Sequence, residues 1–184
     1  MHASASRAAG VLLLLAGGTV IATNAIASDT APPAQGQARP TDEESLALVQ
    51  AINLHEIELA KLALTRPAAQ TTQAMATMLV QEHARNEAAQ ARLGIAPGQT
   101  QAVLALQRQQ QAETDTLIAL APDAFEHAYI DAMVKDHMAA KDLLDERAGL
   151  ARSAPVRAYL VQTRTAVEDH LSQARKLQNG AVGK

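Results

Sequence analysis

Four ionisable residues occupy positions at which the sequence pattern predicts buried apolar side chains. They are Glu56, His83, His137 and His170. Each interrupts a series of apolar residues spaced three or four apart, which is the spacing of one face of an α-helix. Glu56, for example, lies between Ile52 and Leu59. Because the four belong to four different predicted helices, we expect each helix to bring one of them to the centre of a bundle.

A carboxylate and three imidazoles in an apolar core can bind a transition metal. Neutral imidazoles supply the coordinate bonds and the carboxylate offsets part of the charge, which suits Zn²⁺, Cu²⁺, Fe²⁺ or Mn²⁺. The same side chains can instead hydrogen-bond to one another and form a purely structural polar network, or lie partly exposed. The sequence leaves these interpretations open, so no cofactor is certain.

The spacing places these residues at matching heights. Two residues at equal distances from the turn of an antiparallel hairpin lie at one level, because a helix rises about 1.5 Å per residue. The pair on the last two helices, His137 and His170, is centred on the turn predicted at 153–154. The pair on the first two helices is centred on 69–70, shortly after Pro67. Each hairpin is therefore expected to bring its own pair together, and the sequence does not determine whether the pairs share one level.

Three neighbours of these residues are additional candidates. His55 and Glu58 flank Glu56, and a small rotation of the helix would turn either of them inward. Glu82 precedes His83 at the edge of the apolar face. There it would be a ligand or would orient an imidazole through a hydrogen bond.

Start and stop signals divide the chain into four main helices and a long connection. Thr41 and Glu44 form a capping box, and Gly94 fits the residue after a helix C-terminus. The predicted helices cover 41–66, the segment from the turn after Pro67 to Gly94, 122–150 and 153–178, with a helical stretch at 101–120 inside the connection. We therefore expect an all-α fold, a ferritin-like four-helix bundle of two antiparallel hairpins with a long, partly helical connection between helices two and three.

The composition supports this fold and excludes several classes of protein. The 184 residues include 41 alanines, whereas aromatic residues make up 2%, so side chains that favour strands are scarce. Because the chain has no cysteine, disulfides and cysteine-ligated zinc sites are excluded. A net charge of -3 with so few aromatic side chains offers neither a basic surface nor stacking platforms, and no nucleic-acid partner is expected.

The beginning of the chain has the pattern of a secretory signal peptide. Arg7 precedes an apolar stretch at 11–21, and Ala25 and Ala27 occupy the small-residue positions of a cleavage site. The stretch is too short to span a bilayer, so no transmembrane span is expected in the mature chain. We predict a signal peptide at 1–27, a disordered leader at 28–40, the bundle domain at 41–178 and a flexible tail at 179–184. Cleavage near Ala27 would place the mature protein in the periplasm or outside the cell.

Four short motifs follow one another along the chain. They are Glu56–Ala63, Met78–His83, Phe125–Ile130 with His137, and His170–Leu171. Together they resemble the exported bacterial family catalogued as domain of unknown function 4142, over about residues 43–178. The resemblance implies a ferritin-like bundle outside the cytoplasm, with outer-membrane association for some members and no settled activity. The family usually has Asp after the phenylalanine of the third motif; here that position is Glu126, a fourth additional candidate.

These observations lead to two hypotheses for function. In the first, the protein is an exported bundle that binds a transition metal through the four core residues, with His55, Glu58, Glu82 and Glu126 as additional candidates. In the second, it is a non-enzymatic envelope or stress-related structural or interaction protein with a buried polar network. The expected partner is a metal ion or an envelope protein, and the glutamine-rich connection offers a surface for a homo-oligomer.

An enzyme is the less favoured interpretation. Di-iron carboxylate sites in helical bundles require a glutamate three residues before a histidine on two helices. Val80, Val134 and Val167 occupy those positions. The sequence also lacks a glycine-rich phosphate loop.

Overall fold

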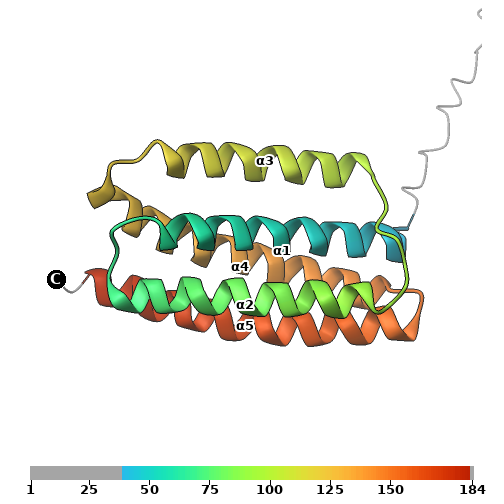
Figure 1. Cartoon of the computed structure of the whole chain (residues 1–184). Helices are drawn as coiled ribbons and strands as arrows, with labels where there is room; N and C mark the ends of the chain where they lie inside the picture. The colour runs from blue at the N-terminus through green and yellow to red at the C-terminus, as the bar shows by residue number, and fades with distance from the viewer. Residues whose placement is uncertain (1–38, 183–184) are drawn as a thin grey trace, which may run out of the picture. The chain divides into compact units, whose positions relative to one another are not determined.

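The computed structural model describes residues 39–182. This range forms five helices: α1 (Asp42–Leu64), α2 (Gln70–Ala91), α3 (Gln101–Ile118), α4 (Pro122–Leu150) and α5 (Ala154–Val182) (Figure 1). No strand occurs within these residues, which confirms the prediction of an all-α fold. The signal peptide predicted at 1–27, most of the leader predicted at 28–40 and the last two residues lie outside the described range.

Local signals in the sequence set the helix ends. The Thr41 side chain accepts a hydrogen bond from the Glu44 backbone N–H at 3.1 Å, and Thr100 caps α3 in the same way through Val103. Pro122 is in the first turn of α4, where its missing N–H costs nothing. Gly94 adopts a φ of 67°, a left-handed conformation that glycine takes without steric strain after a helix.

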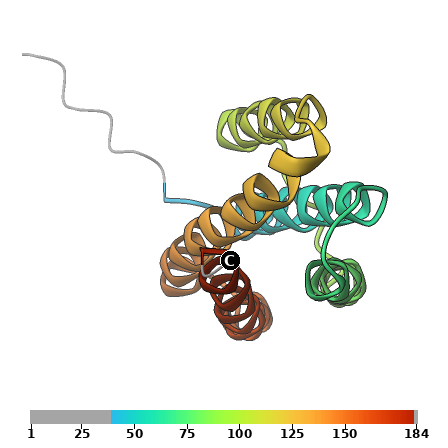
Figure 2. The same ribbon diagram turned by 90° about the vertical axis from the view of Figure 1, so that its left-hand side faces the viewer.

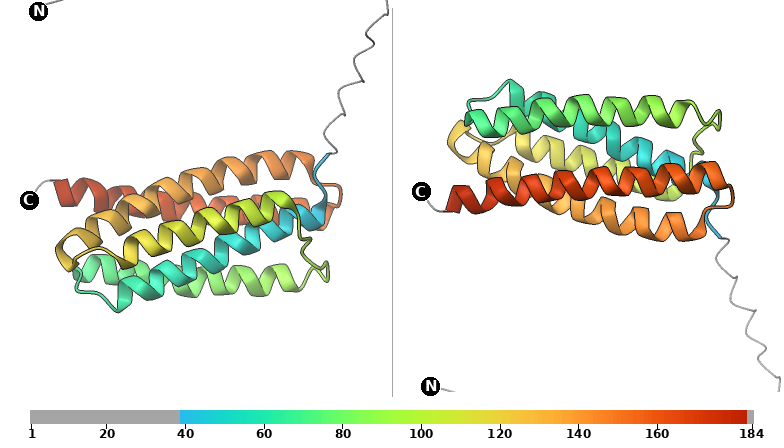
Figure 3. Two further views of the ribbon diagram at one scale, coloured as in Figure 1. Left: turned by 90° about the horizontal axis from the view of Figure 1, so that it is seen from above. Right: turned by 90° about the horizontal axis from the view of Figure 1, so that it is seen from below.

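The helices form two antiparallel hairpins and one separate helix. α1 packs against α2 and α4 packs against α5, while α2 also contacts α5 and α1 also contacts α4. These four helices make the bundle, and α3 lies outside it along α1 and reaches α4 (Figures 2 and 3). Because α3 runs back along the bundle, α4 begins at the end where α1 finishes (Figure 1).

A layer of polar residues divides the bundle core into two apolar parts. One part includes Leu59, Leu79 and Met133, and the other includes Val49 and Leu144. The buried polar residues between the two parts include one candidate from each bundle helix: Glu56, His83, His137 and His170. The two predicted pairs therefore share one level in the bundle.

α5 extends beyond the predicted end of the bundle domain. The apolar pattern ends near residue 178, but the helix continues to Val182. Residues 179–182, predicted as part of a flexible tail, are thus helical, because each residue added to an existing helix gains a backbone hydrogen bond. None of the described helices is long and apolar enough to cross a membrane.

Candidate metal centre

Three imidazole rings meet at the centre of the bundle. His83 of α2, His137 of α4 and His170 of α5 are each no more than 2% exposed. One ring nitrogen from each lies within 4.8 Å of those of the other two, and the ring centroids are 5.2 to 5.9 Å apart. We call these three residues the histidine cluster.

Hydrogen bonds on the far sides of the rings fix two of the three imidazoles. Nδ1 of His137 is 2.8 Å from the Met133 backbone oxygen, which can only accept, so Nδ1 carries the proton. Nε2 of His170 is 2.7 Å from Oε2 of Glu82. The pKa of Glu82 is lowered, mainly by this hydrogen bond, so the carboxylate accepts and Nε2 of His170 donates.

A chain of three polar residues fixes the third imidazole. Asn53 donates from Nδ2 to Oε1 of Glu87 at 2.8 Å, which turns its Oδ1 towards His83 Nδ1 at 2.9 Å. Asn86 also donates to this oxygen, at 3.1 Å. Because Asn53 Oδ1 can only accept, Nδ1 of His83 must carry the proton.

The second nitrogen of each ring is therefore a lone-pair donor without a proton. These atoms are Nε2 of His83, Nε2 of His137 and Nδ1 of His170, and none has a hydrogen-bond partner among residues 39–182. Buried polar atoms without partners are costly. A bound cation would accept the lone pair of each of these nitrogens and so form three coordinate bonds.

Burial keeps the three rings neutral. It lowers the pKa of His137 to about 4, although the hydrogen bond to Met133 acts in the opposite direction. Burial, followed by the two neighbouring imidazoles, holds the pKa of His83 well below its usual range. Burial also lowers the pKa of His170, against the effect of Glu82. Neutral imidazole is the form that binds a metal, so all three rings are ready at neutral pH.

Glu56 lies beside the histidine cluster. Its Oε1 is 3.5 Å from Nδ1 of His137, the nitrogen that is already bonded to Met133, so the carboxyl group is on the outer side of that ring. Within the described chain its Oε2 has no hydrogen-bond partner. Burial raises the pKa of Glu56 to about 8, so the group is largely protonated at neutral pH. The structure thus gathers donor atoms of three of the four predicted residues and places the fourth against one of the rings.

The four additional candidates occupy four different kinds of position. Glu82 has the orienting role, one of the two predicted for it, because it accepts a hydrogen bond from His170. His55 is buried but faces Glu113 of α3, with Nε2 3.2 Å from Oε2. Glu58 is exposed. Glu126 is remote from the cluster, because it accepts hydrogen bonds from the first residues of α2 and the turn before it.

Four polar residues around the centre escaped the sequence analysis. They are Asn53, Glu87, Glu113 and Asp136. Asn53 had a detectable signal, since it precedes Glu56 by three residues and therefore shares its helix face. Glu113 had none, because it belongs to a glutamine-rich segment with little apolar pattern.

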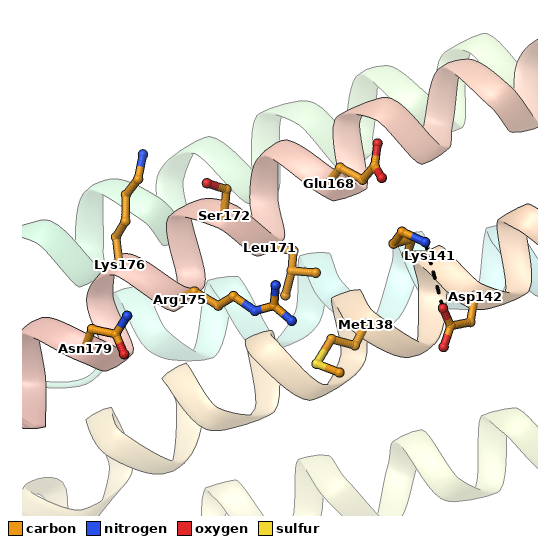
Figure 4. Close-up of a pocket in the computed structure, with 9 residues that line it drawn as sticks. All are labelled: Met138, Lys141, Asp142, Glu168, Leu171, Ser172, Arg175, Lys176 and Asn179. Atoms are coloured by element: carbon orange, nitrogen blue, oxygen red, sulfur yellow. Dashed lines mark ion pairs between the residues drawn. The ribbon is translucent and has the colours of Figure 1, made fainter.

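A surface groove of the bundle is separate from this centre. It has a volume of about 610 Å³ and runs between the outer sides of α4 and α5 (Figure 4). Met138 and Leu171 form its apolar floor, and Lys141, Asp142 and Arg175 are among the charged residues that line it. Charges of both signs alternate there, so the groove shows no preference for a ligand of one charge.

The fold and the centre define an all-helical bundle protein with three buried imidazoles at the middle of its core. The chain belongs to the family described as Domain of unknown function (DUF4142), whose sequence profile matches residues 27–177. The family resemblance seen in the motifs is thereby confirmed. No curated protein and no solved structure matches the chain.

Proposed function

We propose that this protein is an exported metal-binding bundle in which His83, His137 and His170 hold one divalent transition-metal ion. One observation carries this proposal: three buried, neutral imidazoles face one another with unpartnered nitrogens, while each opposite nitrogen is fixed by an acceptor. Metal-bound histidines characteristically have such acceptors behind them.

The donor set favours Zn²⁺ or Cu²⁺ over the other metals considered from sequence. Imidazole nitrogens suit both ions, and Mn²⁺ and Fe²⁺ bind nitrogen donors more weakly. Three histidines leave one position of a tetrahedral zinc site for water or another ligand. The structure therefore supports a site that can bind and exchange a metal.

Glu56 supplies the charge compensation that a buried dication requires. At neutral pH the carboxyl group keeps its proton because burial raises its pKa to about 8. A cation nearby favours the ionised form, so metal binding would release this proton. The resulting carboxylate, in contact with His137, would offset one positive charge in the low-dielectric core.

Export is the second part of the proposal. It rests on the apolar stretch at 11–21 and the small residues Ala25 and Ala27 before Ser28. Expression of the full chain in a bacterium with an intact export system should yield a periplasmic protein that starts near Ser28. A full-length product in the cytoplasm would contradict this part.

Metal titration of the chelator-treated protein tests the first part. We expect about one equivalent of Zn²⁺ or Cu²⁺ to bind by calorimetry and elemental analysis, and we expect His137→Ala and His170→Ala to abolish tight binding. His127→Ala is the matched control, since His127 is an exposed histidine of α4. Lack of binding at micromolar metal, or unchanged affinity in the two core variants, would overturn the assignment.

A satisfied hydrogen-bond network favours a second candidate, a structural role without metal. Asn86 Oδ1 accepts from Thr163, and Tyr159 donates to Gln90 at 3.1 Å, so α2 and α5 are joined by buried polar contacts next to the cluster. Under this candidate the stability of the protein is insensitive to chelator, and the histidine variants lower the melting temperature equally with and without metal.

A further inference from the structure

A second group of potential ligands lies outside the histidine cluster. His55 of α1, Glu113 of α3 and Asp136 of α4 each place one donor atom within 4.8 Å of those of the other two. His55 is 6% exposed, and the side chains of Glu113 and Asp136 are each 16% exposed. We call these three residues the α3 cluster, because only α3 brings the glutamate to the bundle.

The α3 cluster opens into a cavity of about 250 Å³ between α1, α3 and α4. Its three residues line this cavity together with Glu56, and Leu48 and Leu143 are among the apolar residues that line the rest. The cavity therefore has one polar side, formed by an imidazole and three carboxyl groups.

Two oxygens on this side have no hydrogen-bond partner in the described part of the chain. One is Oε2 of Glu56, whose residue is 1% exposed, and the other is Oδ2 of Asp136. A buried carboxyl oxygen that accepts no hydrogen bond is stabilised by a bound cation or by a proton. Glu56 is thus a fully buried side chain that lines the same cavity and has ligand capacity to spare.

One ammonium group already offsets part of the negative charge of the α3 cluster. Nζ of Lys135 pairs with Oε1 of Glu113 and is 3.4 Å from Oδ1 of Asp136. The Lys135 side chain is 59% exposed, so it can turn into solvent without unpacking the core. The ammonium group contacts both carboxylates, so a metal ion that binds them must displace it.

We propose that the α3 cluster is a second cation site, which takes a divalent ion that prefers oxygen ligands, Mn²⁺ or Fe²⁺. His55 supplies one nitrogen and the carboxylates of Glu113 and Asp136 supply oxygens, a donor set suited to these ions. Binding displaces the Lys135 ammonium into solvent. Its ligands differ from those of the histidine cluster, which offers three ring nitrogens.

Glu56 connects the two sites. It contacts His137 of the histidine cluster at 3.5 Å and lines the cavity of the α3 cluster. Its unpartnered Oε2 is the additional oxygen available to an ion in the cavity. Metal in one site therefore affects the other through this single carboxylate.

Titration with Mn²⁺, followed by the electron paramagnetic resonance signal of the free aqua ion, tests the proposal. The protein is first loaded with one equivalent of Zn²⁺, which prefers the histidine cluster. We expect about one further equivalent of Mn²⁺ to bind in the micromolar range. If all Mn²⁺ remains free at these concentrations, the proposal is wrong.

Variants separate the two sites. Glu113→Gln and Asp136→Asn should each weaken Mn²⁺ binding by about tenfold or more, since even the loss of a residue that only orients a ligand costs about 10- to 100-fold. Asp142→Asn, at an exposed carboxylate of α4, should leave Mn²⁺ binding unchanged. His170→Ala should lose Zn²⁺ and keep Mn²⁺, so failure of the histidine site would not be mistaken for failure of this one. Wild-type Mn²⁺ affinity in both α3-cluster variants would overturn the proposal.

Lys135→Met gives a test in the opposite direction. Removing the competing ammonium should tighten Mn²⁺ binding, an outcome that misfolding cannot produce. Thermal unfolding without metal checks that each variant is folded. Unchanged or weaker Mn²⁺ binding by a folded Lys135→Met variant would contradict a site at these carboxylates.

Discussion

The residues behind the imidazoles matter as much as the imidazoles themselves. Asn53 is the clearest case, because its amide is oriented by Glu87 and in turn fixes the proton of His83 on Nδ1. Replacing Asn53 by Ala would free the ring to rotate and to change tautomer. We expect Zn²⁺ affinity to fall by about 10- to 100-fold, the usual cost of losing such a partner.

A competition assay with a chromogenic chelator measures this change. Gln90→Ala is the control, since Gln90 is a buried amide of α2 that bonds to Tyr159 and to none of the residues that fix the histidine rings, so its loss should leave Zn²⁺ affinity unchanged. Equal Zn²⁺ affinity in Asn53→Ala and the wild type would show that the orientation of His83 is irrelevant to binding.

Glu56 should give the metal-free protein a characteristic pH dependence. Its pKa is raised to about 8 by burial, so the folded state holds a proton that the unfolded state releases at lower pH. The free energy of unfolding should therefore fall as pH rises from about 4.5 towards 8 through this group. Asp136 adds to the fall up to about pH 7, because burial and then a hydrogen bond to Glu113 raise its pKa to about 7.

The three histidines of the cluster have the opposite effect on the free energy of unfolding, at pH values below about 6.5. Burial lowers the pKa of His137 to about 4 and lowers those of His83 and His170, so the unfolded state binds more protons below about pH 6.5. Stability contributed by these rings is complete above that pH and is lost as pH falls. Chemical denaturation in chelator should thus show maximal stability near pH 6.5, and Glu56→Gln should flatten the decline between pH 7 and 8. A decline of the same size in Glu56→Gln would refute this role.

The positions of the core residues were predictable from the sequence, but their individual contacts were not. His83 and Glu56 both interrupt apolar faces, and both are buried as expected. Whether a donor atom points at the cluster or at the back of a neighbouring ring depends on side-chain rotamers within the packed layer. For this reason Glu56 was predicted as a ligand equivalent to the histidines, whereas the structure places it beside His137.

At the scale of elements, α3 is held to the bundle by few side chains. Leu117 is 3% exposed and packs into one of the two apolar parts of the core, while Leu104 of the same helix is 37% exposed. Leu117→Ala should lower the free energy of unfolding by about 2–5 kcal/mol, the range for truncating a buried leucine. Leu104→Ala, measured by the same urea titration, should have little effect. Equal effects of the two substitutions would mean that α3 does not pack as described.

Helix ends were better predicted than helix neighbours. The Thr41 cap and the glycine at position 94 carry strong local signals, and α1 and α2 begin or end close to them. α3 was expected to be helical, but its polar sequence gave no indication of which face would contact α1 and α4. The α3 cluster, which depends on that contact, could not be predicted.

At the scale of the molecule, a metal ion in the histidine cluster would join the two hairpins. His83 belongs to the first hairpin, and His137 and His170 belong to the second. Binding to the folded state alone should stabilise it by about 2.7 kcal/mol at a free metal concentration 100 times the dissociation constant.

Hydrogen exchange can show this coupling directly. With Zn²⁺ bound, amide exchange in the central turns of α2, α4 and α5 should slow together. The His170→Ala variant should show no such change at the same Zn²⁺ concentration. Slower exchange confined to one hairpin would contradict a metal shared between them.

The common level of the two pairs is a property of the whole molecule. Within each hairpin, the spacing of the two residues from the turn determines that they lie at one level. The stacking of one hairpin on the other depends on packing of the apolar parts on either side of the polar layer, which no local pattern encodes. The structure supplies this alignment and brings three rings into one cluster.

X-ray absorption spectroscopy of the protein loaded with one equivalent of Zn²⁺ would identify the atoms that bind the metal. We expect three imidazole nitrogens at about 2.0–2.1 Å and one oxygen or nitrogen ligand that is not histidine, with the imidazole signal reduced in His170→Ala. A zinc shell made of oxygen atoms with at most one imidazole would show that the three histidines do not form the metal site.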